Sequence, residues 1–201
     1  MDLGDQIQYW QKENSGMKRQ ILKDCVYKTR VKDHKEVKKV ILNYIEDQPF
    51  LAQNSYIDNI SKFDWPQGGD FERPWVQYFL PHFEKSIGEL CANIGVSRIR
   101  SLDAIWFQQY VEGSSHGWHI HDGQFTGVYY LELPKNSPRT EFMHPFTGNL
   151  DKVRAEEGDV IFFPSHIIHR APSNKNQRKT IISYNFNILD RIMRSDLENT
   201  L

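Results

Sequence analysis

Three histidines in the second half of the chain have the residue type and the spacing of metal ligands. His119 and His121 are two residues apart, and His169 follows fifty residues after the first of them. In an extended strand alternate side chains share a face, so His119 and His121 can present two imidazoles to one point. Imidazole nitrogen binds transition metals well, and three such ligands leave coordination positions open for chemistry. The pattern therefore predicts a metal centre built from these three histidines.

The second ligand position has a rival candidate, because Asp122 directly follows His121. Strand alternation favours His121, since Asp122 points to the opposite face of a regular strand. Gly123 comes next, however, and a glycine permits a turn that would swing the carboxylate inward. Both residues stay candidates, and His121 is preferred.

A cation nine residues after His169 is placed to bind a carboxylate. Arg178 follows the turn-forming segment 172–177, which is long enough for one strand to end and the next to return beside it. The planar guanidinium suits a carboxylate bidentately, and Thr180 would add a hydroxyl donor on the same face. The alternative is an ordinary strand arginine that pairs with a surface acid.

The remaining histidines show no such grouping. His116 and His166 each stand three residues before a candidate ligand, and this odd spacing predicts that they lie on the opposite strand faces. We expect them to be hydrogen-bonded or partly exposed. No neighbouring ligand in the sequence accompanies His34, His82 and His144.

The elements that must position these residues change in character near residue 98. Before it, a β-branched and aromatic run predicts a strand at 25–31, and the apolar spacing predicts helices at 34–47 and 74–94. Pro81 predicts a kink in the second helix. The segment 48–72 is rich in turn residues, which predicts a loop with at most one short helical turn. This half is expected to be a helical support without chemistry.

After residue 98, short β-rich runs alternate with turn residues. Eight strands are predicted, at 100–111, 116–121, 125–132, 139–144, 151–156, 159–163, 166–170 and 178–188. Eight strands in about ninety residues are typical of a double-sheet jelly roll, so the expected fold is mainly β with N-terminal helices. A jelly roll can bring strands of both sheets to one mouth, where the three histidines would meet.

Length and composition indicate one globular domain. Of the 201 residues 39% are hydrophobic, which suffices for a core. We expect an arm and helical support at 1–98, a catalytic core at 99–190 and a tail at 191–201. The net charge of -1 gives no general attraction to nucleic acid or to an anionic membrane. The two cysteines indicate neither a disulfide framework nor a thiolate site, and no apolar run reaches the roughly 20 residues that span a bilayer. A soluble, cytoplasmic protein is expected.

Several motifs occur in an order that resembles a known family. They are Trp106-Phe107-x-x-Tyr110-x-x-Gly113, His119-x-His121, Gly127-Val128-Tyr129-Tyr130-Leu131, Gly158-Asp159-x-Ile161-x-Phe163-Pro164 up to His169, and Arg178-x-Thr180. Over about residues 100–188 this order resembles the Fe(II)/2-oxoglutarate-dependent dioxygenases. It is most similar to small microbial and viral oxygenases with an HxH site before a G-V-Y-Y strand. The departure from the wider family is His121, where a carboxylate is usual.

The resemblance implies a double-stranded β-helix core and a set of cofactors. By position, Fe(II) would be held by His119, His121 and His169. The co-substrate 2-oxoglutarate would be bound by Arg178 and Thr180, with phenolic donors from Tyr110 and Tyr130. The implied reaction consumes O2, releases succinate and CO2, and by default hydroxylates a small-molecule or peptidyl substrate.

Two other functions stay open. A cupin-type metalloenzyme without 2-oxoglutarate fits the spacings from Gly113 to His119 and from Gly158 to His169, although the glutamate that follows HxH in cupins is missing, because Phe125 and Thr126 stand there. A non-catalytic binding module would instead use exposed aromatics for recognition, namely Trp118, Phe125 and Tyr129. The presence of Arg178 with Thr180 favours the dioxygenase.

Overall fold

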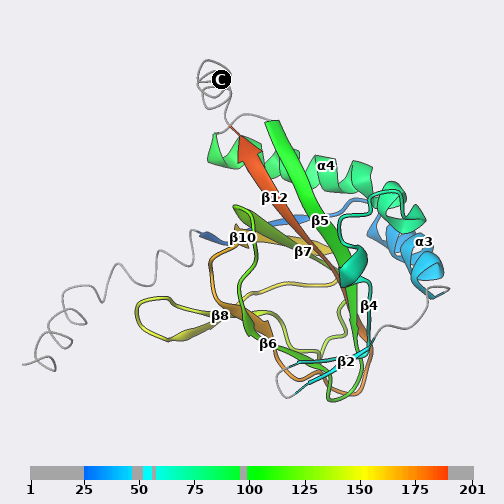
Figure 1. The fold of residues 1–201 in the computed structure, drawn as a ribbon, viewed down its shortest axis with the longest axis vertical. Helices are drawn as coiled ribbons and strands as arrows, with labels where there is room; N and C mark the ends of the chain where they lie inside the picture. The colour runs from blue at the N-terminus through cyan, green and yellow to red at the C-terminus, as the bar shows by residue number, and fades with distance from the viewer. Residues whose placement is uncertain (1–24, 47–51, 56–57, 96–98, 190–201) are drawn as a thin grey trace, which may run out of the picture.

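The fold is built from two six-stranded antiparallel sheets that face each other (Figure 1). The computed structural model describes residues 25–46, 52–55, 58–95 and 99–189. The arm predicted at 1–24 and the tail at 191–201 lie outside these residues. The major sheet has the order β1 (Tyr27–Arg30), β10 (Asp159–Pro164), β7 (Phe125–Glu132), β12 (Lys179–Leu189), β5 (Ile99–Tyr110) and β4 (Lys62–Phe63).

The minor sheet has the order β2 (Gln53–Asn54), β3 (Asp58–Ile60), β6 (Ser115–His119), β11 (His169–Ala171), β8 (Glu141–Met143) and β9 (Leu150–Lys152). Each of the eight strands predicted after residue 98 is present, with shifts of a few residues at the ends. The expected double-stranded β-helix is therefore confirmed.

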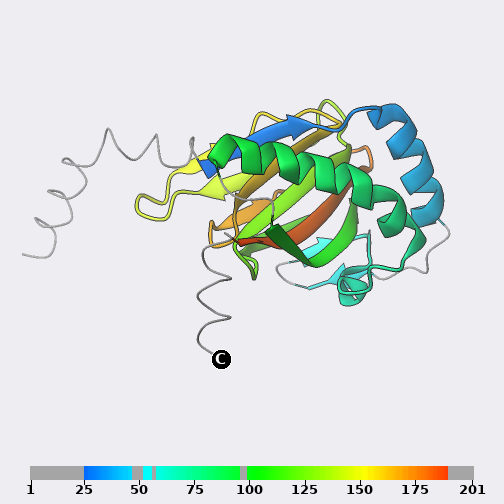
Figure 2. The same ribbon diagram turned by 90° about the horizontal axis from the view of Figure 1, so that it is seen from above.

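Both predicted helices are present and cover the outer face of the major sheet (Figure 2). Helix α3 (His34–Glu46) buries Val37, Ile41 and Ile45, one residue per turn on a single stripe. Helix α4 (Pro74–Ile94) continues through Pro81 and ends at Gly95, whose φ of 72° is the left-handed conformation that suits a glycine cap. None of the helices in the described ranges is long and apolar enough to cross a membrane.

The major sheet separates two apolar cores. The helix-side core joins α3 and α4 to one face of the sheet, and the inter-sheet core fills the space between the two sheets. Alternation along β12 assigns its side chains to these cores: Ile182 and Tyr184 belong to the helix-side core, and Ile181 belongs to the inter-sheet core. This parity decides which residues of β12 can reach a site between the sheets.

The first half of the chain contributes more than the helical support expected of it. Strand β1 pairs with β10, and the segment expected to be loop contains β2, β3, β4 and the 3-10 turn η1 (Trp65–Gln67). The last three of these strands have only two or three residues, which is too short for an alternating pattern to be recognised in the sequence. They extend the edges of both sheets, and β3 borders the strand that carries the first candidate ligand.

Candidate metal centre

The structure brings His119, His121 and His169 together. His119 ends β6, His169 begins β11, and the two are direct cross-strand partners. His121 lies just beyond β6, where its backbone N–H donates to Ser165 O at 3.0 Å. One ligand atom of each histidine lies within 4.8 Å of the other two. The predicted convergence of the three imidazoles is thus present in the fold.

Backbone hydrogen bonds fix how two of these rings are oriented. Nδ1 of His119 lies 2.7 Å from Gly117 O, and Nδ1 of His169 lies 2.8 Å from Ile167 O. Because a carbonyl only accepts, both rings carry the proton on Nδ1 and leave Nε2 with a free lone pair. Metal-binding histidines are held in this way, with the second ring nitrogen donating to a backbone carbonyl.

The spacing of the nitrogens suits one metal ion. Nε2 of His121 and Nε2 of His169 are 3.1 Å apart. Two imidazole nitrogens that each lie about 2.0–2.1 Å from the same ion, at ordinary coordination angles, are roughly 3 Å apart. The donor set therefore fits a borderline ion such as Fe(II) or Zn(II).

Burial keeps the three rings neutral, which is the form that binds metal. Desolvation lowers the pKa of His119, His121 and His169. The neighbouring imidazoles lower the pKa of His121 and of His169 further, because adding a second positive charge nearby is unfavourable. At neutral pH the site consequently presents free lone pairs without having to lose protons.

Asp122 is not part of this group. Its side chain is exposed, and it is absent from the set of converging ligand atoms. Gly123 has a φ of 81°, so the predicted turn does occur there, but it does not bring the carboxylate to the histidines. The assignment of His121 as the second ligand remains a proposal, and the geometry supports it over Asp122.

His116 lies beside the candidate ligands, contrary to the prediction from its spacing. Its ring stacks on that of His119 with centroids 3.8 Å apart and an interplanar angle of 17°. The reason is an irregularity in the pairing of β6 with β11. His119 pairs with His169 and His116 pairs with Ala171, so a step of three residues along β6 matches a step of two along β11. A bulge of this kind turns an odd spacing into a shared face. The prediction for His166, which is exposed, agrees with its position.

Arg178 and Thr180 do not lie near the histidines, which corrects the expectation for both. They share the parity of Ile182, on the helix side of the major sheet. The guanidinium of Arg178 donates two hydrogen bonds of 2.9 Å to the Glu132 carboxylate, and Thr180 donates to the same carboxylate. Arg178 also pairs with Glu46 of α3 at 3.5 Å. It is the strand arginine paired with acids that the sequence left as the alternative.

The cation on the inner face is Lys179, which the sequence reasoning missed. Its side chain is only 2% exposed, and its ammonium lies 4.5 Å from the centre of the Tyr110 ring. Among the described residues no carboxylate forms an ion pair with it; its hydrogen-bond partner is Pro138 O at 3.3 Å. Burial, helped by the charge of Arg139, lowers the pKa of Lys179 to about 8. The sequence indicates that Lys179 and Ile181 share a face of the strand, because they are two residues apart. It does not indicate which face of β12 points between the two sheets.

Both candidate tyrosines belong to the inter-sheet core, on the same side of the major sheet as Lys179. Tyr110 and Tyr130 are buried in the inter-sheet core, where the Tyr130 hydroxyl lies 2.7 Å from Thr140 Oγ1. Burial raises the pKa of Tyr130 to about 12, so it stays a neutral donor. Tyr129 points the other way, into the helix-side core, and its hydroxyl lies 2.6 Å from Nδ1 of His34. Only Tyr110 and Tyr130 are therefore placed near a ligand bound at Lys179.

An orphan donor adjoins the histidines on their other side. Trp106 is 1% exposed, its ring centroid is 5.5 Å from that of His121, and its Nε1–H has no hydrogen-bond partner among the described residues. A buried N–H without a partner is costly. An oxygen atom of a ligand bound at the centre would satisfy it.

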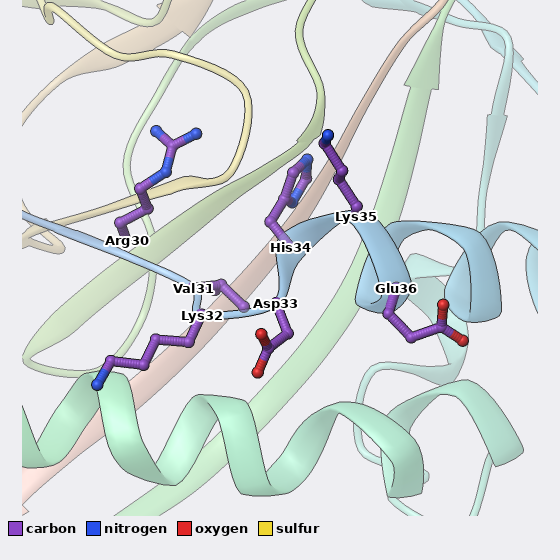
Figure 3. Close-up of a pocket in the computed structure, with 7 residues that line it drawn as sticks. All are labelled: Arg30, Val31, Lys32, Asp33, His34, Lys35 and Glu36. Carbon is purple, nitrogen blue, oxygen red and sulfur yellow. The ribbon is translucent and has the colours of Figure 1, made fainter.

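The three aromatics of the rival binding module differ in exposure, because Tyr129 is fully buried whereas Trp118 and Phe125 are half-buried. Phe125 packs against the helix-side core, to which Tyr129 belongs, and the Trp118 ring is covered by the guanidinium of Arg170 at 4.4 Å. A hollow beside the turn between β1 and α3 is lined by residues 30–36, whose side chains point apart rather than toward one point (Figure 3). His34 in this hollow is already bonded to Tyr129, so the hollow offers no converging chemistry.

The fold is shared with solved oxygenases. An oxidoreductase of the 2OG-Fe(II) oxygenase family from Burkholderia pseudomallei is 14% identical with a TM-score of 0.64, over 87% of this chain and 92% of that one. A prolyl hydroxylase from Trichoplax adhaerens, in complex with a peptide fragment of hypoxia inducible factor, is 17% identical with a TM-score of 0.58, over 97% of both chains. A viral collagen prolyl hydroxylase from Paramecium Bursaria Chlorella virus-1, in complex with 2OG, is 15% identical with a TM-score of 0.57, over 80% of this chain and 94% of that one.

The chain has the double-stranded β-helix fold of these oxygenases. No family model matches its sequence, and no curated protein matches it either. At such low identity the likeness establishes the fold, and the chemistry has to be argued from the residues of the site.

Proposed function

We propose that the protein is an Fe(II)- and 2-oxoglutarate-dependent dioxygenase that hydroxylates a small-molecule or peptidyl substrate. Two observations carry the proposal: three neutral imidazoles converge on one point, and a buried lysine has no carboxylate partner among the described residues. The three imidazoles would bind a metal ion, and the buried lysine would bind an acidic co-substrate. When bound, Fe(II) and 2-oxoglutarate supply the O2-dependent oxidation, with succinate and CO2 as co-products.

The histidines would hold the iron through their Nε2 atoms. His119 and His169 are oriented by their carbonyl hydrogen bonds, and His121 completes the set from the turn after β6. Three imidazoles add no negative charge, so the ion keeps its full charge of 2+. An anionic co-substrate is bound more strongly by such a centre than by one that contains a carboxylate.

Lys179 would bind the distal carboxylate of 2-oxoglutarate, in the role that the sequence assigned to Arg178. It lies across the strand pair from Tyr110, two residues along β5 from Gln108, whose amide lies 3.4 Å from the ring of His116. Two residues of strand span about 7 Å, and we propose that a small dicarboxylate reaches from the lysine to the metal centre along this part of β5. Tyr110, whose ring lies against the Lys179 ammonium, and Tyr130 belong to the same inter-sheet core, and their hydroxyls are hydrogen-bonded to Gln108 and Thr140.

Trp106 is consistent with an oxygen-rich ligand at the centre, because its ring lies against that of His121 and its buried Nε1–H has no partner among the described residues. His169 and Lys179 are both buried, and burial strengthens the electrostatic interaction of each with a bound anion. The substrate itself would approach from the side of His119 and His121, which are both partly exposed.

The test is anaerobic addition of Fe(II) and then 2-oxoglutarate to the purified protein, with the visible metal-to-ligand charge-transfer absorption as readout. We expect a band that requires 2-oxoglutarate, that is lost in His121→Ala, and that needs at least about tenfold more 2-oxoglutarate in Lys179→Ala, since a hydrogen-bonded charge pair contributes roughly 1.5–3 kcal/mol. Arg178→Ala is the matched control, a neighbouring cation on the other face of β12, and it should leave the band unchanged.

The other outcomes separate the alternatives. Stoichiometric metal uptake without a band that depends on 2-oxoglutarate would favour the cupin-type enzyme. Absence of metal uptake would leave the binding module. A band weakened by Arg178→Ala and not by Lys179→Ala would reverse the assignment of the carboxylate-binding residue.

A further inference from the structure

His116 makes a set of contacts that the proposed reaction does not use. Its ring is stacked on His119 at 3.8 Å, and its other side faces Trp65, whose ring centroid is 5.8 Å away. The residue is buried, with 6% of its surface exposed. It does not belong to the group of converging ligand atoms. A buried imidazole pressed flat against a metal ligand, yet not itself a ligand, needs an explanation.

Both nitrogens of His116 are engaged away from the metal centre. Gln108 accepts a hydrogen bond from the Tyr110 hydroxyl on Oε1, at 3.1 Å, and this directs its Nε2–H toward Nδ1 of His116, at 3.4 Å. Nε2 of His116 faces Asp58 Oδ1 at 3.6 Å. The two contacts fix the ring plane and the tautomer, with the proton on Nε2.

Asp58 holds the same region of β6 through the backbone. Its Oδ1 accepts a hydrogen bond of 3.0 Å from the N–H of Gly117. The carbonyl of Gly117 in turn accepts from Nδ1 of His119 at 2.7 Å. One carboxylate on β3 therefore supports His119 along two routes, through the Gly117 backbone and through the stacked ring of His116.

We propose that His116, fixed by Asp58 and Gln108, is a positioning residue that sets the orientation of His119 for metal binding. The inference rests on the proposed metal centre. A ring stacked face to face prevents rotation of His119 about its χ2 angle, while the Gly117 carbonyl fixes its Nδ1 side. Without the stack, His119 would have to lose conformational freedom each time the metal binds, and the affinity would fall. Supporting residues of this kind typically change metal affinity about 10- to 100-fold.

The test uses Co(II), whose visible absorption reports the geometry of the ligands, added anaerobically to the metal-free full-length protein. We expect His116→Ala to weaken Co(II) binding by about 10- to 100-fold and to change the absorption of the saturated protein. His116→Phe, which keeps a flat ring against His119 and loses the polar contacts with Gln108 and Asp58, should recover most of the lost affinity. Asp58→Ala, which removes the oxygen that faces His116 and accepts from Gly117, should weaken Co(II) binding by about tenfold.

The control is His166→Ala, which removes an exposed histidine that lies outside the cluster. It should retain the affinity and the spectrum. Wild-type affinity and spectrum in His116→Ala would overturn the proposal, and should that variant not fold, wild-type behaviour of Asp58→Ala would overturn it as well. Failure of the unaltered protein to take up Co(II) would instead contradict the metal centre itself.

Discussion

Two adjacent cations on β12 have opposite environments. Arg178 lies on the helix side of the sheet between Glu132 and Glu46. Its positive charge is already paired with these two carboxylates. Lys179 is buried between the sheets without a carboxylate, and its lowered pKa is the consequence of that isolation. A buried cation without a counterion costs free energy that a bound anion would recover.

In the proposed enzyme, the lowered pKa of Lys179 makes the binding of 2-oxoglutarate depend on pH. Below about pH 8 the amine is protonated and attracts a carboxylate; above it the free protein loses the proton and the attraction with it. The affinity for 2-oxoglutarate should therefore fall as the pH rises through 8, by up to about tenfold per pH unit. Calorimetric titration of the Co(II)-loaded protein from pH 7 to 9.5 measures this. Lys179→Arg, which stays charged, should give a nearly flat profile; two equal profiles would contradict the role of Lys179.

The sequence predicted the three candidate ligands but not their neighbours, for a physical reason. A spacing of two in a strand gives a shared face whatever the fold, so His119 and His121 could be paired from the sequence alone. The position of Lys179 depends on which face of β12 points between the sheets, and the position of His116 depends on a bulge in β6. Tertiary packing determines the inner face and the bulge, so local spacing could not predict either position.

At the scale of elements, Asp64 joins three pieces of chain that support the site. Its carboxylate accepts hydrogen bonds from Trp75 Nε1 at 3.0 Å and from the Phe107 N–H at 2.7 Å, and it is paired with Arg73. It thereby attaches the start of α4 and the turn η1 to the middle of β5. Trp65 of η1 stacks on Trp106 with centroids 5.9 Å apart.

Removal of this carboxylate should unfold the protein readily. Asp64→Ala leaves the Arg73 guanidinium buried without its counterion, which typically costs about 3–5 kcal/mol. Urea denaturation measures the loss. Glu72→Ala, at an exposed position of the same segment, should stay within about 0.5 kcal/mol of the unaltered protein. A similar midpoint for the two variants would show that Asp64 does not anchor these elements.

Strand β7 depends on a close approach at Gly127. A Cβ atom placed there would lie 2.1 Å from Cε2 of Tyr184, a fully buried ring on the neighbouring strand. Gly127→Ala should therefore destabilise the protein by at least about 1–3 kcal/mol through overpacking. Gly88→Ala is the control within α4, where nothing lies within 4 Å, and it should stabilise the helix by roughly 0.5–1 kcal/mol. Unfolding temperatures that shift in the same direction in Gly127→Ala and Gly88→Ala would refute this account.

The long elements were predictable from the sequence, and the short strands of the first half were not. Helices α3 and α4 and the strands β5, β7, β10 and β12 have enough residues for an apolar period to appear, and the three-residue strands β8, β9 and β11 were predicted from the turn residues that divide the β-rich runs around them. Strands β2, β3 and β4 have two or three residues each and exist because an existing sheet edge offers hydrogen-bond partners. Strand β3 matters to the site, because it carries Asp58.

For the whole molecule, the candidate metal centre joins β6, β11 and the turn that carries His121. A metal that binds only the folded protein stabilises it by about 2.7 kcal/mol at a hundredfold excess over its dissociation constant. Co(II) should raise the unfolding temperature, and a chelator should reverse the shift. His169→Ala should show no shift under the same conditions. An equal rise in that variant would place the binding elsewhere.

The division of the apolar interior by the major sheet has a consequence for how the sequence can change. Substitutions in the helix-side core and substitutions around the histidines touch different side chains, so their effects on folding free energy should add to within about 0.5 kcal/mol. Stability lost while the inner face adapts to a new substrate can then be regained on α3 and α4 without disturbing the chemistry. The fold thus separates the residues that determine folding stability from the residues that would determine substrate preference.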